Sequence, residues 1–167
     1  MTNKGKAHRL PINDNVNTDY IISGRYKFHL QDPKELAKHI FEDISQDFYS
    51  KIERGDFVIA GENFGCGSSR EQAPQAIKAA GIAAVIAKSY ARIFYRNSFN
   101  IGLELIECDT DSISDGDTLS LDLKKSVLLN KAKNIKLYIK PMPPVMRKLL
   151  EDGGVIKHFK KHGGFQF

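Results

Sequence analysis

Apolar and polar positions recur along this chain with the periods of both strands and helices. Short apolar runs at 57–60 and 82–87 are rich in β-branched residues, which is typical of strands buried on both faces. A helical stretch separates the two runs, so we predict a strand, a helix and a second strand parallel to the first. Further strands are predicted at 7–12, 103–107, 118–123 and 135–139, with a turn at Asp115-Gly116.

Helices are predicted where apolar residues recur every three or four positions. The clearest start is Asp32-Pro33-Lys34-Glu35, because aspartate caps a helix, proline fits its first position, and glutamate follows three residues after the cap. Apolar residues then follow at helical spacing, which predicts one amphipathic helix through Leu36, Ile40, Ile44 and Phe48. Other helices are predicted at 71–80, 89–99 and 143–152, the first and last ending at glycines.

Length and composition indicate one compact α/β domain spanning residues 1–167. The chain has 167 residues, of which 41% are hydrophobic and 27% are charged, as is usual for a globular protein. No apolar run approaches the roughly 20 residues that span a bilayer, and no signal-peptide pattern is present, so we expect a cytoplasmic protein without membrane contact. Cys66 and Cys108 are too few to form a disulfide scaffold or to hold a metal cluster alone. The histidines show no metal-ligand spacing, so no metal is assigned.

The formal net charge of +5 allows three interpretations. The excess is concentrated in the lysines of 124–133 and in the tail at 157–162. Such a patch can bind nucleic acid, can be a solvated surface, or can attract a dicarboxylate by its positive potential. No motif combines basic and aromatic residues for base stacking, so nucleic acid is not an expected partner.

The candidate chemistry lies in the segment 61–74, which reads GENFGCGSSREQAP. Glycines permit a tight turn with exposed amides, and Pro74 places the start of the following helix at about Glu71. Ser68, Ser69 and Arg70 therefore lie at or just before a helix N-terminus, where backbone donors favour a carboxylate or phosphate. The alternative is that one serine simply caps the helix. The segment fits neither the phosphate loop nor the dinucleotide fingerprint.

This segment, together with AKSYARIF at 87–94 and DNVNTDYII at 14–22, resembles the aconitase superfamily. More narrowly, it is similar to the family of 3-isopropylmalate dehydratase small subunits, from about residue 8 to the end of the chain. The resemblance implies a swivelling β/β/α domain like the aconitase C-terminal domain. It also implies a hydro-lyase that isomerises 2-isopropylmalate and 3-isopropylmalate through 2-isopropylmaleate, in leucine biosynthesis. The [4Fe-4S] cluster that accepts the leaving hydroxyl is expected on a larger partner subunit, with none bound by this chain.

The resemblance also implies residue roles. Ser68 would be the catalytic base, and Ser69 and Arg70 would bind a carboxylate of the small dicarboxylate substrate. Thr18 and Asp19 match a pair near the active site of the family, although an Asx-type turn would also explain them. The loop 25–29 corresponds to the stretch that reads the variable part of the substrate. Its residues expected to contact the substrate are Arg25, which could instead pair with Asp19, and Phe28, whose ring suits an isopropyl group.

Several alternatives stay open at this point. Lys27 departs from the family's usual apolar residue and could read a carboxylate. Arg92, Arg96 and Asn97 could face the serine loop, or they could serve packing or a subunit contact. The chain could belong to a related hydro-lyase, such as homoaconitase or dimethylmalate dehydratase, or it could be a non-catalytic RNA-binding or regulatory module. The serine pair favours an enzyme, because a pure binding module has no need of it.

Overall fold

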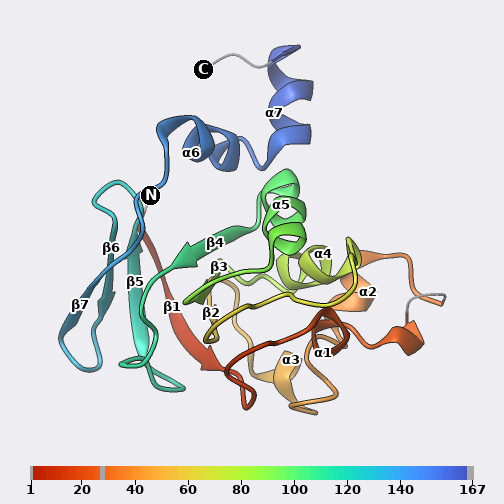
Figure 1. Ribbon diagram of the computed structural model, residues 1–167, viewed down its shortest axis with the longest axis horizontal. Helices are drawn as coiled ribbons and strands as arrows, with labels where there is room; N and C mark the ends of the chain where they lie inside the picture. Colours follow the sequence, from red (N-terminus) through yellow and green to blue (C-terminus); the bar gives the residue numbers. More distant parts are fainter. Residues whose placement is uncertain (1, 27–28, 165–167) are drawn as a thin grey trace.

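The computed structural model describes residues 2–26 and 29–164 (Figure 1). Its centre is a seven-stranded sheet in the order β4-β3-β2-β1-β5-β6-β7. On one side of β1, each pair of neighbouring strands from β1 to β4 is parallel. On the other side, each pair of neighbouring strands from β1 through β5 and β6 to β7 is antiparallel. Their bounds are Thr2–Arg9 (β1), Phe57–Ile59 (β2), Ala84–Ala87 (β3), Glu104–Glu107 (β4), Thr118–Asp122 (β5), Val127–Asn130 (β6) and Ile135–Tyr138 (β7).

Strand β1 joins the two halves of the sheet because different parts of it pair with different neighbours. Residues 2–6 pair with β5, and residues 7–9 pair with β2. The sheet curls at this point, so each parallel strand is covered on both faces. Val58 of β2 packs in the core cluster beneath the helices, whereas Phe57 and Ile59 pack against Leu119 and the other apolar residues of the antiparallel half. The fully apolar composition of β2 and β3 follows from this double burial.

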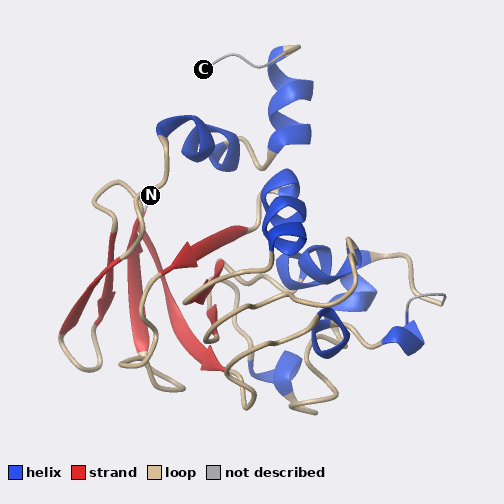
Figure 2. Ribbon diagram, in the orientation of Figure 1, coloured by secondary structure: helices blue, strands red, loops and turns tan. Residues whose placement is uncertain are grey.

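Helices α1 to α5 lie on one side of the parallel half, and α6 and α7 lie beyond the end of α5 (Figure 1 and Figure 2). Helices α4 and α5 pack against each other there, and α6 and α7 follow the last strand, with α7 in contact with α5. In the part of the chain that the structure describes, none of the helices combines the length and the apolar character needed to cross a bilayer. Their bounds are Thr18–Ile21 (α1), Pro33–Ala37 (α2), Phe48–Lys51 (α3), Gln72–Ala79 (α4), Arg92–Ile101 (α5), Pro144–Glu151 (α6) and Val155–His162 (α7), with a 3₁₀ turn at Gly24–Tyr26.

The predicted single helix from Asp32 to Phe48 is wrong beyond its first turns. Asp32 caps α2 as predicted, accepting a hydrogen bond from the backbone N–H of Lys34 at 2.9 Å. The helix then ends at Ala37, and Phe41 adopts a φ of +57° while its N–H donates to the carbonyl of Ile21. Phe41 is fully buried and stacks edge-on against Phe48. Packing of this ring against the core therefore outweighs the helical pattern of the sequence.

The sequence did not predict helix α1, helix α3, strand β6 or helix α7, and one predicted strand was displaced. Strand β6 and helix α7 are absent from the sequence-based assignment, which treated 157–162 only as a basic tail. The first strand covers Thr2–Arg9 rather than 7–12. Strand β6 was missed because it is only four residues long and its buried positions do not alternate with exposed ones. Helix α7 was missed because its most buried residue is a histidine, His158, rather than an aliphatic residue.

Replacing Phe57 by alanine should test the double burial of β2. The side chain is fully buried between the two halves of the sheet, so Phe57→Ala should lower the free energy of unfolding by about 3–5 kcal/mol through lost transfer energy and a residual cavity. Urea denaturation measures the change. Tyr138→Ala, at a side chain of β7 that is 74% exposed, is the control and should stay within about 0.5 kcal/mol of wild type. Equal effects of the two substitutions would contradict this arrangement.

Candidate active site

Three segments that are distant in sequence run side by side and form the floor of the candidate site. Residues 63–67 lie between residues 16–18 and residues 89–91. These are the three stretches on which the family resemblance rests. The backbone hydrogen bonds that join them run from Gly65 N to Val16 O (2.7 Å), from Thr18 N to Cys66 O (2.9 Å), from Phe64 N to Ser89 O (3.0 Å) and from Ala91 N to Phe64 O (2.9 Å).

The glycines of this loop are required by its path. Gly65 has a φ of +78°, and a Cβ placed there would lie 2.2 Å from Cγ of Phe94. Gly67 has a φ of +91°, a conformation that other L-residues rarely adopt. The loop can therefore pack against the first turn of α5 only because Gly65 lacks a side chain, whereas Gly67 is required by its backbone conformation. This contact brings the serines that follow Gly67 next to α5.

Neither serine caps the helix that follows them. Helix α4 begins at Gln72, one residue after the predicted start, and its N-cap is Glu71, which makes no side-chain capping bond. Ser68 and Ser69 are both exposed. The capping interpretation is therefore excluded for both serines. Their hydroxyls do not take the N-cap role that is usual for a serine at the start of a helix.

Thr18 holds Ser68 in place from the neighbouring segment. Its side chain is 2% exposed, and its Oγ1 donates to the backbone carbonyl of Ser68 at 2.9 Å. The same Oγ1 lies 3.4 Å from Oγ of Ser68. The Asx-type turn considered for this region is present, but Asn17 makes it by accepting hydrogen bonds from the N–H groups of Asp19 and Tyr20. The turn and the contact with Ser68 thus coexist on adjacent residues.

Arg70 is already engaged by its own chain. Its Nη2 lies 2.5 Å from Oδ1 of Asp19, and its Nη1 donates to the carbonyl of Ile22 at 2.9 Å. Its Nε is buried and makes no hydrogen bond within residues 2–26 and 29–164. Arg25 does not pair with Asp19, because it forms ion pairs with Asp43 and Glu42 instead. The fork expected to grip a ligand is thus partly occupied by an exposed carboxylate.

The serines and Arg70 line a cleft of about 400 Å³ together with the start of α5. Arg92 adds a second, exposed guanidinium, and none of the ion pairs in the described part of the chain involves it. Asn97 also lines this cleft, whereas Arg96 lines an adjacent cavity with Tyr95 and Glu107. The lining residues are Thr18, Asn63, Gly65, Gly67, Ser68, Ser69, Arg70, Ala91, Arg92, Ile93, Phe94 and Asn97.

The structure therefore gathers some of the predicted site residues and leaves others apart. Thr18, Ser68, Ser69 and Arg70 line the cleft, and Asp19 reaches it through Arg70. Arg25 is absent from the lining residues, and Phe28, like Lys27, lies outside the described residues. Asn63 and Ile93 belong to the recognised motifs but were not singled out, because nothing in their residue types marks them as ligands. Only the pairing of three segments brings them to the cleft.

Comparison with known proteins agrees with this fold and cleft. Residues 23–110, which include the serine loop and all of α5, match the aconitase C-terminal domain family. The molecule is therefore an aconitase-type C-terminal domain, and the mixed α/β fold predicted from the sequence is confirmed. More narrowly, the chain belongs to the family of 3-isopropylmalate dehydratase small subunits.

Three relatives support the narrower assignment. The chain is 54% identical to 3-isopropylmalate dehydratase small subunit 2 of Archaeoglobus fulgidus, over 90% of this chain and 91% of the relative. It is 50% identical to the small subunit from Caldicellulosiruptor saccharolyticus, over 96% and 92%. A crystal structure of 3-isopropylmalate dehydratase from Methanocaldococcus jannaschii matches with a TM-score of 0.92 and 47% identity, over 98% of this chain and 96% of that one.

The contact between the loop and α5 can be tested at Gly65. Gly65→Ala combines a strained φ with a clash against Phe94, whereas Gly116→Ala has a similar φ of +80° and no atom within 4 Å. The control should lose about 1–2 kcal/mol from the φ strain alone. Gly65→Ala should lose about 1–3 kcal/mol more, the typical cost of overpacking. Chemical denaturation of both variants measures the difference, and equal losses would show that the close approach does not constrain the loop.

Proposed function

We propose that this chain is the small subunit of a 3-isopropylmalate dehydratase, and that residues 1–167 act as one swivelling unit. With a large subunit it interconverts 2-isopropylmalate and 3-isopropylmalate through 2-isopropylmaleate, a step of leucine biosynthesis. The observation that carries the proposal is the single cleft that places two serine hydroxyls beside two guanidinium groups, those of Arg70 and Arg92. Its volume of about 400 Å³ is within the range of small-molecule sites.

Ser68 is the residue to which we assign proton transfer. Dehydration removes a proton from the carbon next to a carboxylate, while the hydroxyl leaves from the neighbouring carbon. A serine hydroxyl is a weak base in water, so it must act as an alkoxide that positive charge and hydrogen-bond donors stabilise. Helix α4 begins at Gln72, three residues after Ser69, and we assign such donors to its N-terminus. Thr18 positions Ser68 by holding its backbone carbonyl.

Ser69, Arg70 and Arg92 are the groups to which we assign carboxylate binding. Arg92 is exposed at the cleft and forms no ion pair within the described chain, so it can bind one carboxylate of the substrate directly. Arg70 must either release Asp19 or add the substrate beside it, because Asp19 occupies its Nη2. Asp19 is then a positioning residue that holds the arginine side chain extended before substrate arrives.

The iron–sulfur cluster of this reaction belongs, in this proposal, to the large subunit. Such clusters are held by cysteine thiolates, and the chain has two cysteines. Burial, with a smaller contribution from Asp109, raises the pKa of the Cys108 thiol to about 12, so this side chain stays protonated at neutral pH. The residues of this chain do not fit the cluster. The partner must therefore supply the group that accepts the leaving hydroxyl.

The substrate's variable side chain is assigned to the loop that carries Arg25 and Phe28. Phe28 suits an isopropyl group, which favours isopropylmalate over a tricarboxylate. Arg25 is held by Asp43 in the structure, so its direct contact with substrate would require that ion pair to open. Both roles, and the cytoplasmic location, stay predictions from the sequence.

Ser68→Ala tests the proposed base. The chain and its cognate large subunit are mixed under anaerobic conditions, and turnover of 2-isopropylmalate is followed. The variant should lose about 10²–10⁴-fold in kcat, the usual contribution of a general base, while gel filtration shows unchanged assembly. Ser50→Ala, at an exposed serine outside the cleft lining, should keep wild-type turnover. A wild-type complex that neither hydrates nor dehydrates any malate derivative would sink the enzyme assignment and leave the RNA-binding or regulatory alternative.

Arg70→Lys tests the carboxylate clamp. Lysine keeps the charge but loses the planar fork, so KM should rise roughly 10- to 100-fold, which corresponds to about 1.5–3 kcal/mol for a charge-assisted contact. Arg54→Lys, at an exposed arginine away from the cleft, is the matched control. Steady-state kinetics measures KM separately from kcat. An unchanged KM in Arg70→Lys would assign carboxylate binding to Arg92 rather than to Arg70.

A further inference from the structure

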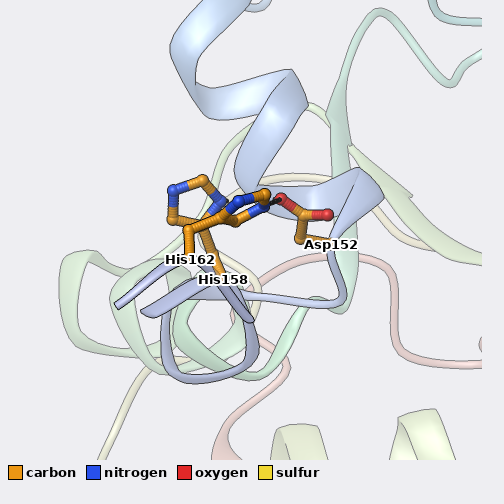
Figure 3. Close-up of side chains that lie close together, drawn as sticks. All are labelled: Asp152, His158 and His162. Carbon is orange, nitrogen blue, oxygen red and sulfur yellow. Dashed lines mark hydrogen bonds and ion pairs between the residues drawn. The ribbon is translucent and has the colours of Figure 1, made fainter. Parts of the chain in front are cut away.

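Three side chains with metal-ligand chemistry meet where α6 joins α7, apart from the cleft (Figure 3). Asp152 is the C-cap of α6, and His158 and His162 are at positions i and i+4 of α7. This spacing places both rings on one face of a helix. One candidate ligand atom from each side chain lies within 4.8 Å of the others. The sequence-based expectation of no metal-ligand spacing overlooked this helical pair, because α7 itself was not predicted.

The cluster is largely removed from solvent. The side chains of Asp152 and His158 are 5% and 0% exposed, whereas that of His162 is 24% exposed. Between the two helices, a Cβ at Gly154 would lie 2.4 Å from the carbonyl oxygen of Asn100, so the turn is pressed against the end of α5. The backbone therefore fixes the distance between Asp152 and α7. One side of the cluster, at His162, stays open to water.

The two oxygens of Asp152 have different partners. Oδ2 lies 2.7 Å from Nδ1 of His158 and 3.1 Å from Nε2 of His162. Oδ1 accepts a hydrogen bond from Nζ of Lys161 at 2.5 Å. One oxygen thus faces both rings while the other is held from outside. Oδ2 is therefore the oxygen available to a metal ion, whereas the ammonium of Lys161 on Oδ1 is a positive charge that opposes such an ion.

We propose that Asp152, His158 and His162 bind one divalent transition-metal ion, with Zn²⁺ as the best match. Imidazole nitrogen with a single carboxylate oxygen suits zinc, whereas Mg²⁺ and Ca²⁺ prefer oxygen ligands alone. Tetrahedral zinc with bonds of about 2.0–2.1 Å sets its ligand atoms ~3.3 Å apart. The contacts of 2.7 and 3.1 Å need to open only slightly for an ion to replace the shared protons. Water completes the fourth position on the His162 side.

The site would act on structure rather than on the reaction. A metal ion there links the end of α6 to α7, and α7 contacts α5, whose first turn lines the cleft. The lysines of α7 weaken the attraction for a cation, and Lys161 is the nearest of them to the ligands. Removal of Lys161 should therefore increase the affinity of the site for a metal ion. If the cluster is held together only by hydrogen bonds and ion pairs, the same removal should instead weaken it.

Zinc titration of the untagged, chelator-treated full-length chain tests the proposal. Calorimetry should show one Zn²⁺ per chain, and the metal should raise the Tm. His162→Gln removes the exposed ligand and should weaken binding at least about 10-fold, the smallest loss seen when even an outer-shell group is removed. His29→Gln, at an exposed histidine outside the cluster, should bind like wild type. Absence of zinc binding by wild type, or equal binding by His162→Gln, overturns the proposal.

Two further measurements keep the test decisive if His162→Gln folds poorly. Lys161→Ala should bind Zn²⁺ more tightly than wild type and gain more Tm on its addition, whereas an unchanged or weaker affinity overturns the proposal. Co²⁺ provides a spectroscopic readout, because tetrahedral nitrogen and oxygen ligation gives visible d–d bands without the intense thiolate charge-transfer band that binding at Cys66 or Cys108 would add. Thiolate bands in the wild type would assign the metal to the cysteines and contradict the site at α7.

Discussion

The site depends on one backbone arrangement, in which residues 63–67 run between residues 16–18 and residues 89–91. Four main-chain hydrogen bonds hold them together, and the contact with α5 is possible only because Gly65 has no side chain. Beneath this layer, Phe64 packs edge-on against Phe94, which ties the loop to the core. The positions of Ser68, Ser69 and Arg92 all follow from this arrangement. A shift of the loop would separate the hydroxyls from the guanidinium groups at once.

The two arginines of the cleft, Arg70 and Arg92, differ in whether a carboxylate of this chain pairs with them. Arg70 is extended by Asp19 and by the carbonyl of Ile22, so its geometry is set before any ligand binds, at the cost of competition from an internal carboxylate. Arg92 carries no such partner within the described residues. For the proposed dicarboxylate substrate, the cleft therefore holds one arginine that is already positioned and one that forms no ion pair within the described residues. In the proposed function, the partner subunit supplies the electrophilic group that the reaction also needs, because the two cysteines of this chain are too few to hold an iron–sulfur cluster.

Local signals in the sequence predicted the elements that local physics controls. The cap at Asp32, the start of α4 near Glu71 and the end of α6 before Gly153 lie where capping, proline and glycine rules place them. The same reasoning failed where packing or pairing of side chains decides. Phe41 leaves the helical pattern because its ring fills the core beside Phe48, and α7 forms on a buried histidine that pairs with Asp152. Neither partner can be read from the neighbouring residues.

The sequence by itself determined the chemistry available to this protein: a glycine-framed loop with two serines and an arginine, the family to which it belongs, and the mixed α/β order of its elements. These follow from residue types at short spacing, where few backbone conformations are allowed. Only the tertiary structure decided which groups meet. It paired Arg70 with Asp19, placed Arg92 and Asn97 at the cleft, and joined Asp152 to His158 and His162. Such pairings depend on how the whole chain packs, because the energy of each contact is small beside that of the core that positions it.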